Sequence, residues 1–348
     1  MTETRIRLLD TTLSGASAAI GYGFNANYTY AMTQAMEDAG VDAIEVGHGL
    51  GLGAERQGRA PACESDYRHM QAARMAARKA RIGVSARTGT ALEADIETAQ
   101  RAGMDFVRVG VDAALVDSAR GLVDHAVATG LETQLILFNV YSLPVAELRN
   151  FAGTLGAWGL STVVISDCAG GMVPAQVRNY VRALTDKTDL SVGFAGRDNM
   201  QLAAGNAFAA IEAGARQVEG ALKGMGTGAG TIQLESFAGA LRKAGLSVQA
   251  DPLELDGVAN KFITKAEFAR GRGHDELIQA LSLLPESSAI EVEGVAGEYG
   301  LEPAALAIQA GRIGGGLPMD RNALRAVAQI AIWAREDGVS ERDDSAVI

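Results

Sequence analysis

Short apolar stretches recur through most of the chain, and each follows a segment whose apolar residues have helical spacing. A pair of small residues lies between the helical segment and the apolar stretch, as in Ala39-Gly40 and Ala102-Gly103. The glycine is suited to the left-handed backbone conformation that ends a helix. The apolar stretches alternate little, which is typical of strands buried on both faces. Eight strands are predicted in this way, near residues 5–10, 41–47, 81–86, 104–110, 133–138, 161–166, 190–195 and 216–221.

Amphipathic segments lie between these strands. Among them are Ser65–Ala80, Ala91–Ala102, Val145–Trp158 and Pro174–Leu184. Eight strand–helix units in about 245 residues predict a TIM (β/α)8 barrel. A doubly wound open sheet is the alternative, but it usually has fewer strands and carries a phosphate-binding fingerprint after the first, which this sequence lacks.

The strand–helix alternation stops near Asp251-Pro252, and the pattern beyond it predicts helices only. The expected helices are Leu253–Arg270, Asp275–Leu283, Ala289–Tyr299, Pro303–Ala310 and Arg321–Glu336. We therefore expect a barrel domain over residues 1–250, a helical C-terminal domain over 251–340 and a frayed tail over 341–348.

Composition narrows the classes of partner. A net charge of -11 disfavours a nucleic acid or an anionic membrane, since either needs a basic face. The two cysteines, Cys63 and Cys168, give no disulfide or zinc pattern. No stretch approaches the ~18 apolar residues of a membrane helix, and the polar start is unlike a signal peptide. A cytoplasmic protein is therefore expected.

Several short motifs fall where strands are expected to end or in the helical tail. They are Asp10–Ala16 (DTTLSGA), Ile44–Gly49 (IEVGHG), Ser166–Met172 (SDCAGGM), Gly224–Gly230 (GMGTGAG), Glu298–Leu301 (EYGL) and Ala310–Arg312 (AGR). In this order they resemble the hydroxymethylglutaryl-CoA lyase-like family of barrel enzymes, in particular its 4-hydroxy-2-oxovalerate aldolases. The resemblance covers most of the chain. It implies an aldolase-type enzyme that makes or breaks a carbon–carbon bond beside the carbonyl of a small oxo acid.

The sequence departs from this family where the family binds its divalent metal. The resemblance implies an aspartate ligand after the first strand and two histidine ligands at the seventh, and these positions hold Gly15, Ala195 and Arg197. Ser14 replaces an arginine that polarises the substrate, and Ala18 replaces a catalytic histidine. We therefore expect no metal at the usual site. Manganese or magnesium remains compatible with a relocated site that uses carboxylates such as Asp198.

The remaining candidates are polar residues at the C-terminal ends of strands, where barrel active sites lie. Carbon–carbon cleavage needs an electron sink, and Lys223 can supply one as a protonated Schiff base. Asp198 and Asp10 are candidates for moving protons, and Tyr22 for donating to a developing enolate oxygen. The candidate substrate contacts are His48, Arg87, Asn139, Asp167, Arg197 and Asn199.

Each candidate also has a structural interpretation. Asp10 and Asp167 suit carboxylates that close the loops after their strands, and Lys223 suits a solvated loop lysine. Arg108 is expected to point into the barrel and pair with Glu45, Asp105 or Glu219. The glycine loop at residues 224–230 is interpreted as a mobile lid or as a loop whose backbone N–H groups bind a ligand carboxylate.

A non-catalytic role is the alternative from a different class. A barrel that has lost its family chemistry can persist as a ligand-binding scaffold. It can also persist as the partner of an acylating aldehyde dehydrogenase, which the resemblance implies would bind through the C-terminal domain. A homo-oligomer is the default expectation for such a barrel.

Overall fold

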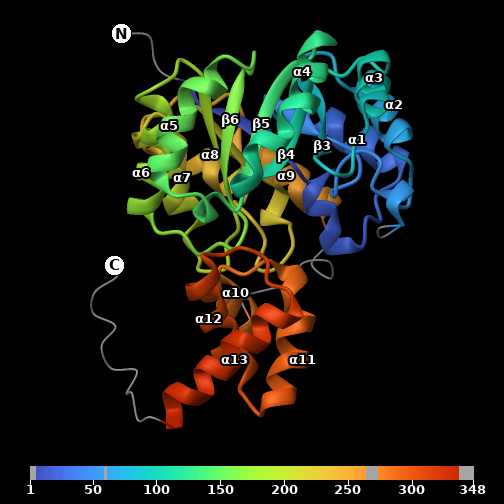
Figure 1. Ribbon diagram of the computed structural model, residues 1–348. Helices are drawn as coiled ribbons and strands as arrows, with labels where there is room; N and C mark the ends of the chain where they lie inside the picture. The colour runs from blue at the N-terminus through green and yellow to red at the C-terminus, as the bar shows by residue number, and fades with distance from the viewer. Residues whose placement is uncertain (1–4, 59–60, 264–272, 337–348) are drawn as a thin grey trace. The chain divides into compact units, whose positions relative to one another are not determined.

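Eight parallel strands close into a barrel in the computed structural model, which describes residues 5–58, 61–263 and 273–336 (Figure 1). The strands are β1 (Arg7–Asp10), β2 (Ala43–Glu45), β3 (Arg81–Arg87), β4 (Phe106–Asp112), β5 (Glu132–Phe138), β6 (Thr162–Asp167), β7 (Ser191–Gly196) and β8 (Gln217–Gly220). Each strand pairs with the next, and β8 pairs in parallel with β1. The predicted TIM barrel is confirmed.

Helices follow the strands and surround the barrel (Figure 1). They are α1 (Ala26–Asp38), α2 (Asp66–Ala76), α3 (Glu93–Arg101), α4 (Arg120–Ala128), α5 (Val145–Gly156), α6 (Pro174–Thr185), α7 (Ala203–Glu212) and α8 (Leu234–Lys243). Gly40 and Gly103 adopt φ angles of 85° and 78° after α1 and α3. They end these helices as the sequence predicts, because a side chain is strained in that conformation.

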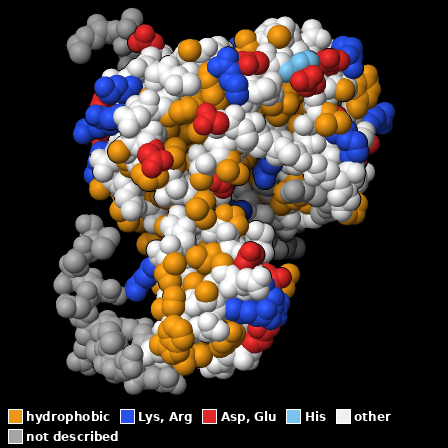
Figure 2. All heavy atoms as spheres, viewed as in Figure 1, with side chains coloured by type: hydrophobic (Ala, Val, Ile, Leu, Met, Phe, Trp, Pro, Cys, Tyr) orange, Lys and Arg blue, Asp and Glu red, His pale blue; other side chains and the backbone are white. Residues whose placement is uncertain are grey.

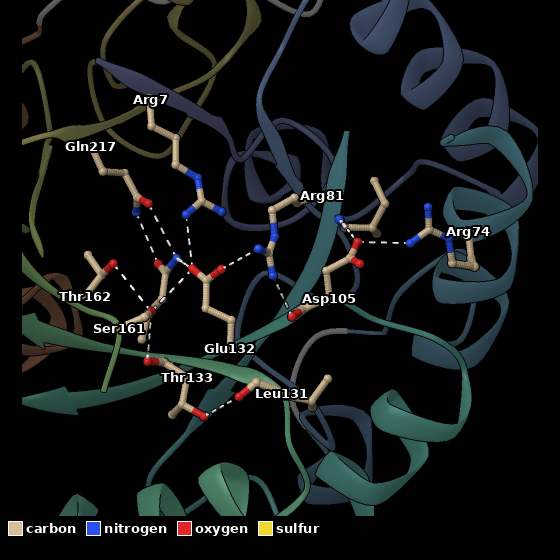
Figure 3. A network of polar contacts seen from close by, with 12 residues as sticks. Arg7, Arg74, Arg81, Asp105, Leu131, Glu132, Thr133, Ser161, Thr162 and Gln217 are labelled. Atoms are coloured by element: carbon tan, nitrogen blue, oxygen red, sulfur yellow. Dashed lines mark hydrogen bonds and ion pairs between the residues drawn. The ribbon is translucent and has the colours of Figure 1, made fainter. Parts of the chain in front are cut away.

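A polar network closes the N-terminal end of the barrel (Figure 3). Arg7 and Arg81 both reach Glu132, at 3.0 and 2.9 Å, and Gln217 donates to Gln134 at 3.1 Å. These side chains come from the first three residues of their strands, so they lie at the end opposite to the one where barrel enzymes carry their chemistry. We assign this network to stability.

Alternation along the strands decides which side chains face the barrel axis. Arg108 of β4 reaches Glu45 of β2 and Glu219 of β8, and contacts between strands that are not neighbours run through the interior. On β7, Phe194 lies on the outer side, where a Cβ on Gly196 would meet both Phe194 and Ala203 of α7. Ala195 and the residue after Gly196, Arg197, therefore belong to the inner side.

The second compact unit consists of helices and has its own core. Its helices are α10 (His274–Ser282), α11 (Ala289–Tyr299), α12 (Pro303–Gly314) and α13 (Arg321–Glu336). Val295, Leu306 and Leu324 are buried together, so three of these helices share one apolar cluster. Figure 2 shows hydrophobic side chains gathered on one face of this unit. Ile330 and Trp333 of α13 are 46% and 62% exposed.

The boundary between the two units lies later than expected. Contacts divide the chain after Arg272, not after residue 250. The reason is helix α9 (Pro252–Phe262), whose Leu255 and Ala259 are buried in the same cluster as the barrel helices. The predicted extension of this helix to Arg270 and the predicted tail fall outside the described residues. None of the helices that the structure describes is long and apolar enough to cross a bilayer.

Candidate functional site

Asp10 is fully buried at the end of β1 and serves to fix the loop that follows. Its carboxylate accepts the Thr12 backbone N–H at 2.9 Å and the Thr12 hydroxyl at 2.7 Å. The Thr12 Oγ1 in turn accepts the Leu222 N–H at 2.9 Å, which ties this loop to the segment after β8. Burial raises the pKa of Asp10 to about 7, although both Thr12 bonds oppose the rise. These contacts favour the structural interpretation.

Asp167 and Asp198 also hold local backbone. Asp167 accepts the N–H groups of Gly171 and Met172 at 3.2 and 2.9 Å, and burial raises its pKa to about 6. Asp198 accepts the Ala203 N–H at 3.0 Å, at the first residue of α7, and burial raises its pKa. That bond takes one of the two Asp198 oxygens. Proton transfer by Asp198 and substrate contact by Asp167 stay predictions.

Lys223 occupies a strained loop position with a φ of 53°. Its Nζ donates to the Ile263 carbonyl at 2.9 Å, and its backbone N–H donates to the buried Glu235 at 2.9 Å. A nucleophilic amine must present its lone pair to the substrate. Here the amine instead donates to a backbone carbonyl beyond α9, so the geometry favours a structural role for Lys223.

Tyr22, His48 and Arg87 lie on the side of the barrel formed by the first three strands. The Tyr22 and His48 rings lie 4.2 Å apart between centroids. His48 Nδ1 accepts the Leu50 N–H at 3.1 Å, so a neutral His48 carries its proton on Nε2. Arg87 donates to the Gly49 carbonyl at 3.0 Å. The structure thus joins the predicted catalytic Tyr22 to two predicted substrate contacts, His48 and Arg87, through the loop after β2.

A second group lies at the ends of β4 to β7. The Tyr141 hydroxyl donates to Asn139 Oδ1 at 2.8 Å, and Asn139 Nδ2 donates to Asp112 at 2.9 Å. Burial raises the pKa of Tyr141 above its usual value, while the Arg197 charge acts in the opposite direction. Burial likewise raises the pKa of Cys168, and Arg197 again opposes the rise. Arg197 is therefore in electrostatic reach of both side chains.

Sequence reasoning missed two members of this group, Asp112 and Tyr141. Asp112 is the last residue of β4, and the predicted strand ended two residues earlier at Gly110. Tyr141 stands two residues after Asn139, a residue that was predicted to bind substrate. A search for polar residues shortly after every strand would have found both, but not their connection, because Asp112 and Asn139 are 27 residues apart.

Asn199 connects two loops, and its predicted contact with substrate stays a prediction. Its Nδ2 donates to the Ala169 carbonyl and its Oδ1 accepts the Ala229 N–H, both at 3.0 Å. A Cβ on Gly230 would lie 2.0 Å from the Gly224 carbonyl oxygen, so the glycine loop folds tightly upon itself. The structure shows this loop fastened to the ends of β6 and β7. Its movement as a lid stays a prediction.

Arg108 forms the floor beneath these groups. It is 1% exposed and lies 2.6 Å from Glu45 at the nearest atoms, and it also pairs with Glu219. This confirms the predicted internal pairing with two of the three expected partners. One guanidinium is thus shared between two buried carboxyls. Burial raises the pKa of Glu219, and the charge of Arg108 opposes this rise.

The side chains at the metal positions that the resemblance implies do not fit a divalent cation. Gly15 and Ala195 offer no ligand atom, and Arg197 brings a positive charge to the inner end of β7. Carboxylates and neutral imidazoles are the groups that hold such ions. Within the described residues, no three His, Cys, Asp or Glu side chains converge as a ligand group.

Comparison with known proteins places the chain in a family. Residues 5–261 match the HMGL-like family model. A 4-hydroxy-2-oxovalerate aldolase of Thermomicrobium roseum is 30% identical, over 89% of this chain and 88% of its own length. One from Burkholderia pseudomallei is 35% identical over 69% of each chain. The chain therefore belongs to the HMGL-like family.

A solved structure supports the fold. The carboxyl transferase domain of Rhizobium etli pyruvate carboxylase, determined with pyruvate, has a TM-score of 0.72 at 18% identity. The match covers 97% of this chain and 62% of that chain. Identity at this level shows a shared fold.

Proposed function

We propose that this chain cleaves or forms the carbon–carbon bond beside the carbonyl of a small 2-oxo acid. The reaction class is supported by the HMGL-like family and by relatives named 4-hydroxy-2-oxovalerate aldolase. The observation that carries the proposal is the position of Arg197. It belongs to the inner side of the barrel at the end of β7, and its charge reaches Tyr141 and Cys168.

Arg197 supplies the electron sink in this proposal. When the bond breaks, its electron pair moves into an enolate on the 2-oxo acid fragment, and the hydroxyl of the other fragment loses its proton to become an aldehyde. A guanidinium stabilises the enolate oxygen and can hold the neighbouring carboxylate through two hydrogen bonds. Asp198 is the proposed acceptor of the hydroxyl proton, because a carboxyl whose pKa is raised by burial is a better base. Protonation of the enolate carbon then completes the 2-oxo acid.

The test is a cleavage assay with 4-hydroxy-2-oxovalerate that measures pyruvate release. Arg197→Met should lower kcat by about 100-fold or more, the usual scale for losing one charge-stabilising donor. Arg197→Lys should restore part of the rate, and Asp198→Asn should shift the pH dependence of kcat. An Arg197→Met protein with wild-type kcat would contradict the assigned role.

Two other routes give different results in the same assay. Adduct trapping with borohydride and pyruvate, abolished in Lys223→Ala, would establish the Schiff-base route. Stoichiometric manganese or magnesium in the purified protein, removed by chelator together with activity, would establish a relocated metal site. Each result would replace Arg197 as the electron sink.

Partner binding is the second candidate function, and the exposed Ile330 and Trp333 on α13 favour it. We propose that this face contacts either a second copy of the chain or an acylating aldehyde dehydrogenase. Light scattering after size-exclusion chromatography measures the first, and co-elution with such a dehydrogenase measures the second. A monomer that binds no dehydrogenase and cleaves oxo acids would leave catalysis as the sole function.

A further inference from the structure

Three residues at the ends of β4 and β5 form a chain of hydrogen bonds with a fixed direction. The Tyr141 hydroxyl donates to Asn139 Oδ1 at 2.8 Å, and Asn139 Nδ2 donates to Asp112 Oδ2 at 2.9 Å. The other Asp112 oxygen accepts the Ala114 N–H at 3.1 Å. A carboxylate only accepts hydrogen bonds, so Asn139 must turn its amide nitrogen toward Asp112 and its oxygen toward Tyr141.

The direction of this chain determines what Tyr141 can offer to a ligand. A phenol has one proton and two lone pairs, and the amide oxygen of Asn139 can only accept. The proton of Tyr141 is therefore committed to Asn139. Toward any other group, the Tyr141 oxygen can therefore only accept a hydrogen bond. Burial raises the pKa of Tyr141, which favours the protonated hydroxyl.

The surroundings bring this acceptor to the proposed site. Asp112 lies on the inner side of β4, two alternations above Arg108, whose pairs cross the barrel interior. The charge of Arg197 reaches Tyr141 from the end of β7. The turn at Val140–Ser142 that carries Tyr141 packs against β6, and β6 pairs with β7. A small substrate held by Arg197 at the end of β7 therefore lies one strand away from this fixed acceptor.

The backbone of Asn139 has a conformation that residues other than glycine rarely adopt. Its φ is 50° and its ψ is 46°, in the left-handed region that asparagine tolerates better than most residues. Strained backbone of this kind is frequent at sites that must place a group accurately. The strain fits a residue whose work is to orient Tyr141.

We propose that Tyr141 accepts a hydrogen bond from a second hydroxyl of the substrate, one that does not take part in bond cleavage. The site would then select oxo acids whose aldehyde portion carries a hydroxyl, and disfavour those with a plain alkyl group. Asn139 and Asp112 act as positioning residues that keep the acceptor turned toward the ligand. This inference rests on the proposed aldolase function and names its substrate class.

The experiment runs the reaction toward synthesis with pyruvate and two aldehydes of nearly equal size, glycolaldehyde and propanal. The measured quantity is the ratio of their kcat/KM values, each pair determined on one preparation, so a partly unfolded sample does not change it. The wild type should favour glycolaldehyde about tenfold, the discrimination that one well-made hydrogen bond provides. Tyr141→Phe should bring the ratio near one.

Two further variants separate the roles. Asp112→Asn leaves the amide of Asn139 without a fixed direction, so the ratio should fall part of the way. Tyr180→Phe is the matched control, because the Tyr180 hydroxyl donates to the Leu143 carbonyl at 2.8 Å and takes no part in the chain. It should keep the wild-type ratio.

The outcomes distinguish the two proposals. If neither aldehyde is converted by the wild type, the proposed aldolase function fails and this inference fails with it. If both are converted and Tyr141→Phe keeps the ratio within about twofold of the wild type, the aldolase function stands and the recognition by Tyr141 is refuted. A wild type that prefers propanal would refute it as well.

Discussion

Replacing Asp10 by asparagine should remove the contribution of this carboxyl to the pH dependence of folding stability. Burial raises the Asp10 pKa from 3.8 to about 7, so the folded protein binds this proton more tightly than the unfolded chain does. The stabilisation is fully present below pH 3.8 and is lost as the pH rises to about 7. At about 1.4 kcal/mol for each pKa unit, the loss is about 2 to 3 kcal/mol between pH 5 and 8.

The assay is urea unfolding of Asp10→Asn and of the parent protein at several pH values. Trp158 in the barrel is 4% exposed, and Trp333 lies in the second unit, so a Trp333→Phe background makes tryptophan fluorescence report on the barrel alone. The parent should lose stability as the pH rises, and the variant should not. The unfolding free energy of Asp10→Asn minus that of the parent should therefore increase by about 2 to 3 kcal/mol between pH 5 and 8. The contributions of groups that do not interact with Asp10 cancel in this difference.

A matched carboxyl gives the opposite sign. Asp95 accepts hydrogen bonds from Arg56 and from the Leu92 N–H, and they hold its pKa below the usual value despite partial burial. Asp95→Asn should therefore lose stability relative to the parent as the pH rises through the range where Asp95 ionises. A difference for Asp10→Asn that stays flat from pH 5 to 8 would refute the assigned cause, namely burial of an ionisable group.

Three other variants test the remaining contacts. Arg108→Met leaves Glu45 and Glu219 buried without their cation, and should cost about 3 to 5 kcal/mol in urea unfolding at pH 8; a cost below about 1 kcal/mol would contradict the buried pairing. Asn199→Ala frees the Ala229 amide, so hydrogen exchange there should quicken while the amides of β3 exchange as before. Lys223→Met should leave the pyruvate-release rate within about threefold of the wild type if the amine is structural, and complete loss of activity in a folded variant would restore the Schiff-base route.

The placement of polar groups shows what local sequence cannot specify. Asp10, Asp167 and Arg197 all stand at strand ends, and the sequence offers each of them both a functional and a structural interpretation. In the folded protein the carboxylates of Asp10 and Asp167 accept hydrogen bonds from backbone N–H groups of their own loops. Arg197 continues the inner side of β7 instead. The difference depends on strand register and loop path, which short-range pattern leaves open.

Lys223 and Tyr141 make the same point over longer distances. The acceptor of the Lys223 amine is the carbonyl of Ile263, which is 40 residues away, at the end of a helix that sequence assigned to another domain. Asp112 fixes Tyr141 through Asn139, across two strands. No spacing rule predicts such contacts, because they form only when the barrel has closed.

The sequence by itself determined the barrel, its eight strands and the helical tail. Those features follow from hydrophobic periodicity and from glycines such as Gly40 and Gly103, which act within a few residues. Only the tertiary structure decided that α9 belongs with the barrel, since it packs against α8 and also against α1 at the other end of the barrel sequence. Only it decided which charges face the axis. A side chain's role at a strand end depends on the neighbours that folding brings to it, and those come from other strands.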